Sequence, residues 1–292
     1  MAQLQRQGGA DTVVNAPPLE APREFQFSDA DFRYLSKLAY ENAGIVLSQN
    51  KYNLVYSRLS RRLRTLNLQS FQDYREYLSS NSQEIENFIN SISTNHTKFF
   101  RESHHFDHLR NGVLVPFLQQ APASRGNRFR IWSAGCSSGE EPYTIASVVR
   151  RELRDAPNLD LKILATDIDT DILGKAERGD YQAAALADVP KQYQEHFRES
   201  GGKLQMSPKV KELITFRQLN LLQPWPFKGP FDVIFCRNVM IYFDNPTKTN
   251  LVERFTQQLK PGGWLYIGHS ESLIGGHPGL KLVGRTIYRR DA

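Results

Sequence analysis

Two adjacent glutamates follow a short glycine-containing loop in the segment RFRIWSAGCSSGEEPYTIA, which spans residues 128–146. The apolar residues before the loop are typical of a β-strand, and Pro142 with the residues after it suits the first turn of a helix. Loops between a strand and a helix usually direct backbone amides at a phosphate group. Here Glu140 and Glu141 would lie where that anion binds. Carboxylates at this position favour a cationic ligand instead.

The spacing of the glycines excludes two common phosphate ligands. A nucleoside triphosphate site would need GxxxxGK[ST], whereas Gly139 is followed by the residues EEP and no lysine. A dinucleotide site would need GxGxxG, and Gly135 has no second glycine at either required spacing. S-adenosylmethionine carries a sulfonium and an ammonium group and has no phosphate. A carboxylate at about 4 Å attracts such a charge by about 1 to 4 kcal/mol, depending on screening, so the loop favours this cofactor.

A further carboxylate follows the next predicted strand. Asp167 lies in the segment LATDIDTD, 26 residues beyond Glu141 (167 − 141 = 26). At the end of a strand, a carboxylate can accept hydrogen bonds from both hydroxyl groups of a ribose. Asp169 and Asp171 add negative potential, although both could instead cap and begin a helix. We therefore predict that Asp167 binds the ribose.

Four segments of the chain together resemble the chemotaxis receptor glutamate O-methyltransferases, the CheR family. They are, in chain order, TNHTKFFRE, IWSAGCSSGEEPYTIA, ATDIDTDIL and FDVIFCRNVMIYF. The resemblance extends from about residue 28 to the C-terminus. It implies a helical N-terminal domain followed by a Rossmann-type S-adenosylmethionine domain. It also implies methyl transfer to glutamate side chains on the cytoplasmic helices of chemoreceptors, with S-adenosylhomocysteine as the product.

The resemblance further implies which residues form the site. The implied cofactor-binding positions are Asn95, Thr97, Arg101, Glu141, Asp167, Asn220, Leu221, Arg237 and Asn238. Arg101 is also a candidate for catalysis, because it could hold the carboxylate of the acceptor or of the cofactor. Tyr242 is the second catalytic candidate, for a hydrogen bond near the path of the methyl group.

A glutamate acceptor places a modest demand on these residues. With an ordinary pKa of roughly 4.3, its side chain is already a nucleophilic carboxylate at neutral pH, so no general base is required. The enzyme has only to align the acceptor oxygen, the methyl carbon and the sulfur in a cleft that excludes water. Orientation of this kind can supply up to roughly 7 to 11 kcal/mol.

The elements that must position these groups alternate between strand and helix after about residue 106, which predicts a parallel sheet with helices on its faces. The strand candidates are FRIWSAG, LKILATDID, ITFRQLN, FDVIFCRN, GGWLYIGHS and, as a closing antiparallel strand, LKLVGRTIYRR. The turn-rich segment ESGGKLQMSPKVKEL indicates a small β-hairpin insertion within about residues 192–217. We therefore predict an α/β, Rossmann-like methyltransferase domain over residues 106–292.

The first third of the chain has a different pattern. Residues 1–27 are rich in Gln, Gly, Ala and Pro without hydrophobic periodicity, so we expect a disordered tail. Helical patterns over residues 28–93 predict a small all-helical domain, which we expect to dock the receptor. Residues 94–105 form the predicted linker, which contributes to the cofactor site.

A basic helix is predicted within the helical domain. Residues 51–64 contain five basic and no acidic side chains, while leucines recur at helical spacing. On charge alone this could be an ordinary solvated surface. The methylation regions of receptors are acidic before modification, however, so basic side chains could steer the enzyme onto them. The predicted partner-binding residues are Arg58, Arg61, Arg62 and Arg64.

The net charge of +6 also allows a different acidic partner, so two alternatives stay open. One is a nucleic-acid methyltransferase, although CRNVMIYF stands where enzymes that methylate base amines typically have an Asn or Asp, Pro, Pro, aromatic run. We therefore expect no nucleic-acid partner. The other is a signalling module that binds S-adenosylmethionine without turnover. The intact set of candidate pocket residues argues against this second alternative.

Composition predicts the setting of the protein. No apolar run approaches the roughly 18 residues of a membrane-spanning helix, and the polar N-terminus lacks the apolar centre of a secretion signal. We expect a cytoplasmic monomer without direct membrane insertion.

Neither the cysteines nor the histidines predict a metal site. Cys136 and Cys236 show no CxxC spacing, which predicts two reduced core residues. His104, His105 and His108 have no acid or cysteine at fitting spacing, so we predict that they lie on a helix surface.

Overall fold

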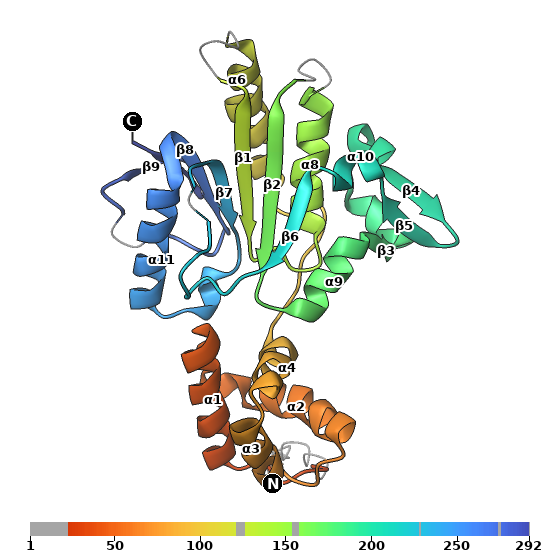
Figure 1. Ribbon diagram of the computed structural model, residues 1–292, viewed down its shortest axis with the longest axis vertical. Coiled ribbons are helices and arrows are strands. Elements are labelled where there is room, and N and C mark those ends of the chain that lie inside the picture. The colour runs from red at the N-terminus through yellow and green to blue at the C-terminus, as the bar shows by residue number, and fades with distance from the viewer. Residues whose placement is uncertain (1–22, 121–125, 154–157, 228, 274–275, 292) are drawn as a thin grey trace, which may run out of the picture.

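The computed structural model describes residues 23–120, 126–153, 158–227, 229–273 and 276–291. A small all-helical domain comes first, and a linker joins it to a larger α/β domain (Figure 1). This arrangement confirms the predicted fold class.

Local sequence signals set the ends of the first helix. The Ser28 hydroxyl accepts a hydrogen bond from the Asp31 N–H (3.2 Å), and the Asp31 carboxylate accepts one from the Ser28 N–H (3.0 Å). Gly44 ends the helix with φ of 67°, a left-handed conformation that favours glycine. The helices of this domain are α1 (Asp29–Ala43), α2 (Tyr52–Leu66), α3 (Phe71–Ser80) and α4 (Ser82–Ile92), with a 3-10 turn η1 (Gln49–Lys51) before α2.

The helical domain begins before its first helix. Phe25 and Phe27 are buried in the core of the domain, and the Phe27 ring centroid lies 4.4 Å from that of Phe71. The predicted disordered tail over residues 1–27 is therefore wrong for these last residues, because two aromatic rings give them a place in the core. Residues 1–22 of that prediction lie outside the described residues.

A seven-stranded sheet forms the centre of the α/β domain. Its order is β6-β2-β1-β7-β8-β10-β9, and the first five strands run parallel. The strands are β1 (Arg128–Ala134), β2 (Asp160–Asp167), β6 (Ile214–Gln218), β7 (Phe231–Cys236), β8 (Leu259–Ile267), β9 (Leu280–Gly284) and β10 (Ile287–Arg290). The strand order reverses beside β1, so the carboxyl ends of β1, β2 and β7 meet where ligands of such sheets bind.

Helices cover both faces of this sheet. Successive side chains of β1 point to opposite faces, and apolar residues on both faces need a cover. Phe129 and Ile131 pack in one apolar cluster with residues of α8, whereas Trp132 packs in a second cluster with residues of α11. The helical segments are α5 (His104–His108), the π-helical η2 (Leu109–Leu114), α6 (Val115–Gln119), α8 (Glu140–Glu152), α9 (Thr170–Arg178), η4 (Ala183–Asp188), η5 (Lys191–His196), α10 (Pro208–Lys211), η6 (Met240–Tyr242) and α11 (Asn245–Gln258).

The insertion is a three-stranded sheet at one side of the domain (Figure 1). Strands β4 (Phe197–Ser200) and β5 (Lys203–Met206) form the hairpin expected from the turn-rich sequence. However, β3 (Asp180–Gln182) pairs with β5 as a third strand. The predicted bounds of 192–217 are also wrong at the other end, because residues from 214 onward belong to β6 of the main sheet.

The C-terminal segment forms a hairpin rather than one strand. Strand β10 pairs antiparallel with β8 as predicted, but the chain turns at Arg285 and Thr286, so β9 becomes the edge strand. This turn covers His105, whose Nε2 lies 3.3 Å from the Arg285 carbonyl oxygen. Burial lowers the pKa of His105 to about 3. The predicted helix-surface position of the histidines is therefore wrong for this residue.

His108 is also held by the sheet, since its Nδ1 lies 2.8 Å from the Tyr266 hydroxyl oxygen. No group of three or more His, Cys, Asp or Glu side chains that could hold a metal occurs within the described ranges. Cys136 and Cys236 are buried and unpaired, which confirms their prediction as core residues. Over the same ranges no helix is long and apolar enough to cross a lipid bilayer.

Candidate functional site

A cleft lies at the carboxyl ends of the central strands. This edge of the sheet faces the helical domain (Figure 1). It encloses about 1040 Å³ of empty volume, part of it open to solvent. Every residue predicted for cofactor binding or catalysis lines it: Asn95, Thr97, Arg101, Glu141, Asp167, Asn220, Leu221, Arg237, Asn238 and Tyr242. None of the four arginines predicted for partner binding is among the lining residues.

The loop after β1 lines part of the cleft. Gly135 has φ of 81°, and a Cβ atom there would lie 2.3 Å from the Val239 side chain. Glycine thus lets the loop after β1 pack against the loop after β7. Of the two glutamates that follow, Glu141 lines the cleft. The expectation for Glu140 is wrong, since its side chain accepts a hydrogen bond from the Ser138 hydroxyl (2.6 Å) and does not line the cleft.

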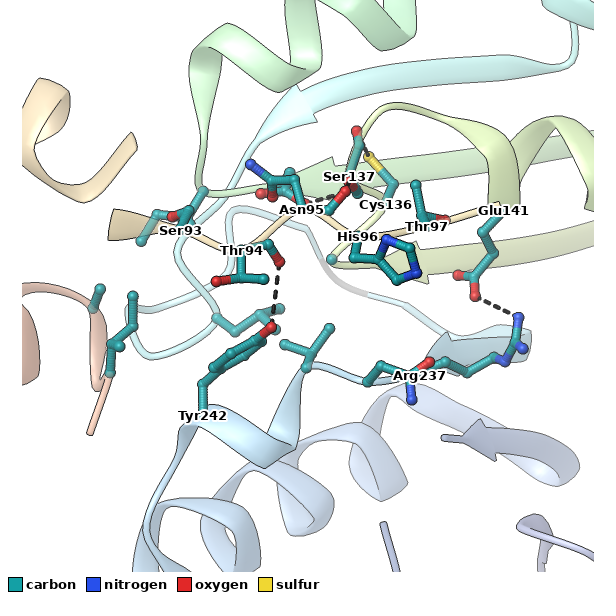
Figure 2. Close-up of a pocket in the computed structure, with 18 of the residues that line it drawn as sticks. Ser93, Thr94, Asn95, His96, Thr97, Cys136, Ser137, Glu141, Arg237 and Tyr242 are labelled. Carbon is teal, nitrogen blue, oxygen red and sulfur yellow. Dashed lines mark hydrogen bonds and ion pairs between the residues drawn. The ribbon is translucent and has the colours of Figure 1, made fainter. Parts of the chain in front are cut away.

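Glu141 belongs to a buried charge cluster. Its Oε1 accepts a hydrogen bond from the Ser133 hydroxyl (2.7 Å), and its Oε2 accepts one from Arg237 Nη1 (2.9 Å; Figure 2). Arg237 also lies 3.4 Å from Glu102 Oε2 and donates to the Arg101 carbonyl oxygen. The cluster therefore pairs one guanidinium with two carboxylates beside the cleft.

Burial and ion pairing act in opposite directions on these carboxylates. Burial raises the pKa of Glu141 even though Arg237 opposes this effect. Burial also opposes ionisation of Glu102, but Arg237 and hydrogen bonds from His269 lower its pKa to about 2. Glu102 has φ of 58°, so the chain takes up an unfavourable backbone conformation where it delivers this carboxylate to Arg237.

Asp167 ties together the loops after β1 and β2. Its Oδ2 accepts from the Ser137 N–H (2.8 Å), and its Oδ1 accepts from the Asp169 N–H (3.1 Å). Burial raises the pKa of Asp167 to about 6. Asp169 caps α9 through the Ile172 N–H (3.0 Å), which is the helix-capping role weighed for it from the sequence.

The linker between the domains runs along the cleft and lines it with residues 93–98 (Figure 2). The Tyr242 hydroxyl donates to the Thr94 carbonyl oxygen (3.3 Å), and the Ser137 hydroxyl donates to the Asn95 carbonyl oxygen (3.0 Å). Arg101 Nη1 donates to the His96 carbonyl oxygen (3.0 Å). Backbone carbonyls thus fix the linker against the α/β domain and leave its side chains to line the cleft.

The helical domain supplies one wall of the cleft, which the sequence did not indicate. Ala43 and Ile45, on either side of the glycine that ends α1, line it. Two hydrogen bonds hold this corner to the α/β domain. The Asn220 side-chain amide donates to the Asn42 carbonyl oxygen (2.7 Å), and the Val46 N–H donates to the Tyr242 carbonyl oxygen (2.9 Å).

Sequence reasoning also missed a buried acid behind the cleft. Glu271 accepts hydrogen bonds from the N–H groups of Gly268 (2.6 Å), Asn238 (2.8 Å) and Ile241 (3.1 Å). These bonds hold Asn238 at φ of 60° and so shape the turn that carries Asn238 and Tyr242. The available signal was an acid in the segment GHSE directly after the β8 strand.

Comparisons with known proteins cover both domains. The family model described as "CheR methyltransferase, all-alpha domain" matches residues 30–93, and that described as "CheR methyltransferase, SAM binding domain" matches residues 95–288. The chain is 47% identical over 260 residues to a probable chemotaxis protein methyltransferase of Rhizobium etli, covering 86% of this chain and 96% of the relative. It is 43% identical over 278 residues to the chemotaxis protein methyltransferase of Escherichia coli, covering 92% of this chain and 94% of the relative.

Proposed function

Since this chain belongs to the CheR methyltransferase family, we propose that it methylates glutamate side chains on the cytoplasmic helices of chemoreceptors. Its cofactor is S-adenosylmethionine, and it is a chemotaxis protein methyltransferase. The products of the proposed reaction are glutamate methyl esters and S-adenosylhomocysteine. The observation that best supports the proposal is the meeting of all ten predicted site residues in one cleft between the two domains.

The lining of the cleft suits the cofactor. Glu141 and Asp167 are carboxylates that can attract the ammonium and accept from the ribose, and the apolar side chains of Ile45, Leu221 and Phe243 can cover the adenine. When bound, the cofactor supplies a methyl group on a positively charged sulfur. Charge and polarity are therefore distributed as an adenosyl sulfonium ligand requires.

The residues of the chain then have to orient an acceptor rather than activate it. A glutamate carboxylate oxygen forms the new bond to the methyl carbon while the bond from that carbon to sulfur breaks, and the electron pair stays on the sulfur. No proton moves in this step, so no general base is needed. Arg101 holds a carboxylate of the acceptor or of the cofactor, and Tyr242 borders the path of transfer.

Methyl transfer to purified receptor fragments tests this function. The full chain, S-adenosylmethionine with a tritiated methyl group and cytoplasmic receptor fragments should yield labelled protein. The label should be released as volatile methanol in alkali, since methyl esters hydrolyse there and N-methyl groups do not. Binding of S-adenosylhomocysteine without transfer would indicate a non-catalytic module, and transfer to nucleic acid would indicate the other alternative.

We also propose that the protein acts in the cytoplasm as a monomer.

Cofactor affinity should depend on the ionisation of Asp167. Since the carboxylate with a pKa of about 6 accepts from the ribose best when ionised, affinity for S-adenosylhomocysteine should fall as pH decreases through 6. If only the ionised form binds, the loss between pH 7 and pH 5 is about tenfold. Calorimetry should show this pH dependence for the wild type. Asp167→Asn should bind S-adenosylhomocysteine more weakly, and its affinity should change less with pH. Asp171→Asn, at an exposed position in the first turn of α9, should retain the pH dependence of the wild type; a wild-type affinity that does not change over this range would contradict the prediction.

Arg61 should contribute to receptor docking through charge. Its side chain is exposed, and no ion pair involves it among the described residues, whereas Arg62 and Arg64 pair with Glu84 and Glu24. Arg61→Glu should lower the rate of receptor methylation several-fold at low ionic strength, with a smaller effect in high salt because screening weakens steering. Arg33→Glu, an equal charge change at an exposed position on α1, is the control. Equal losses in both variants would contradict a docking role for Arg61.

A further inference from the structure

We propose that Arg58 of the basic helix α2 is a positioning residue for the cofactor site, because its guanidinium fixes the start of the linker that lines the cleft. Arg58 Nη1 donates to the carbonyl oxygens of Ile92 (2.5 Å) and Ser93 (2.7 Å). Its Nη2 donates to the Thr94 hydroxyl (3.1 Å). One side chain thus binds three consecutive residues where α4 ends and the linker begins.

These contacts satisfy groups that a helix end leaves open. Ile92 is the last residue of α4, so its carbonyl has no partner within the helix. A cation at this position also complements the negative end of the helix dipole. Arg58 is half-buried, as expected for a side chain that serves the interior of the protein rather than its surface.

The linker segment held by Arg58 belongs to the cleft. Ser93, Thr94 and Asn95 all line it (Figure 2). On the other side of Thr94, the Tyr242 hydroxyl donates to its carbonyl oxygen, so a residue from each domain holds Thr94. One residue further, Asn95 Nδ2 donates to Asp169 Oδ2 (2.6 Å). Displacing Ser93 and Thr94 would therefore shift Asn95 and the cofactor-binding residues that follow.

The other arginines of the basic helix have different surroundings. Arg62 forms a bidentate pair with Glu84 inside the helical domain, with distances of 2.7 and 2.5 Å. Arg64 pairs with Glu24 near the N-terminal end of the described chain. Arg58 is the arginine of this helix whose side chain reaches the linker, as far as the described residues show. The helix thus serves both the proposed docking surface and the cofactor site.

Calorimetric titration of the full chain with S-adenosylhomocysteine tests this role. Arg58→Ala should weaken binding at least fivefold, and Arg58→Lys should lose less because an ammonium can still donate to the carbonyls. Arg61→Ala should bind as the wild type does. Arg62→Met should be less stable but should keep the affinity of the folded protein, because its pair lies away from the linker.

Two results would overturn the role of Arg58. One is wild-type affinity in Arg58→Ala, and the other is an equal loss in Arg58→Ala and Arg62→Met, which would indicate general damage to the helical domain. If Arg58→Ala does not fold, Arg58→Gln, which keeps one donor group, provides the same comparison. The inference rests on the cofactor part of the proposed function. A chain that binds S-adenosylhomocysteine but methylates no receptor would therefore overturn the substrate and leave this test valid.

Discussion

Replacing Arg237 by methionine is expected to lower the free energy of unfolding by about 3 to 5 kcal/mol. The guanidinium is buried between Glu141 and Glu102, at 2.9 and 3.4 Å. Methionine fills a similar volume against the ring of Phe106 but removes the guanidinium from the buried Glu141 and the half-buried Glu102. Urea denaturation at pH 7 measures the loss, and Arg33→Met at an exposed position of α1 is the matched control.

The pH dependence of that loss has a definite sign. The folded-state pKa of Glu102, about 2, lies below its ordinary value of 4.5, so the ion pair contributes stability that is fully present above pH 4.5. This contribution disappears as pH falls through 2. The difference in the free energy of unfolding between wild type and Arg237→Met should therefore be largest at neutral pH and should decrease below pH 4.5. A triple variant that adds Glu102→Gln and Glu141→Gln should recover part of the stability, and a loss below about 1 kcal/mol in the single variant would contradict a buried, paired cluster.

Replacing Arg101 by alanine should lower methyl transfer by more than tenfold without unfolding the protein. The guanidinium lines the cleft and donates one hydrogen bond to the His96 carbonyl, which uses one of its five N–H groups. The remaining groups can hold a carboxylate with charge-assisted bonds, whose loss costs more than that of neutral ones. The side chain is partly exposed, so stability should change little.

Steady-state kinetics and calorimetry together identify which carboxylate Arg101 holds. A role with the acceptor predicts a higher KM for the receptor and unchanged affinity for S-adenosylhomocysteine. A role with the cofactor predicts weaker binding of S-adenosylhomocysteine. Arg101→Lys, which keeps the charge without the planar fork, should retain part of the activity. Unchanged turnover in Arg101→Ala would remove this residue from the site.

Parallel strands deliver their carboxyl ends to one edge of the sheet, and this rule predicts Glu141 and Asp167 at the cleft, whereas the other eight predicted positions are implied by the family resemblance. Motifs at the ends of β1, β2 and β7 are far apart in the chain but meet by topology. The periodicity of apolar residues along the chain predicts the α/β fold and the helical first domain, since both depend on local sequence patterns. What it could not predict are contacts between segments whose separation no local pattern fixes.

Three differences illustrate that limit. His105 has the sequence context of a surface helix but is buried, because the turn between β9 and β10 lies over it. Arg62 has the context of a free basic surface residue but pairs with Glu84 of another helix. Phe25 follows a polar tail but reaches the core of the helical domain. In each case the partner lies more than 20 residues away, and charge or composition alone does not identify it.

The wall that the helical domain gives to the cleft has a consequence for how the protein responds to its ligand. Ala43 and Ile45 come from one domain, and Asp167 and Asn238 from the other, so a ligand in the cleft touches both. Its binding free energy is then shared by the two domains and opposes their separation by RT ln(1 + [L]/Kd). A concentration of the methyl donor well above Kd would therefore also stabilise the contact between the two domains.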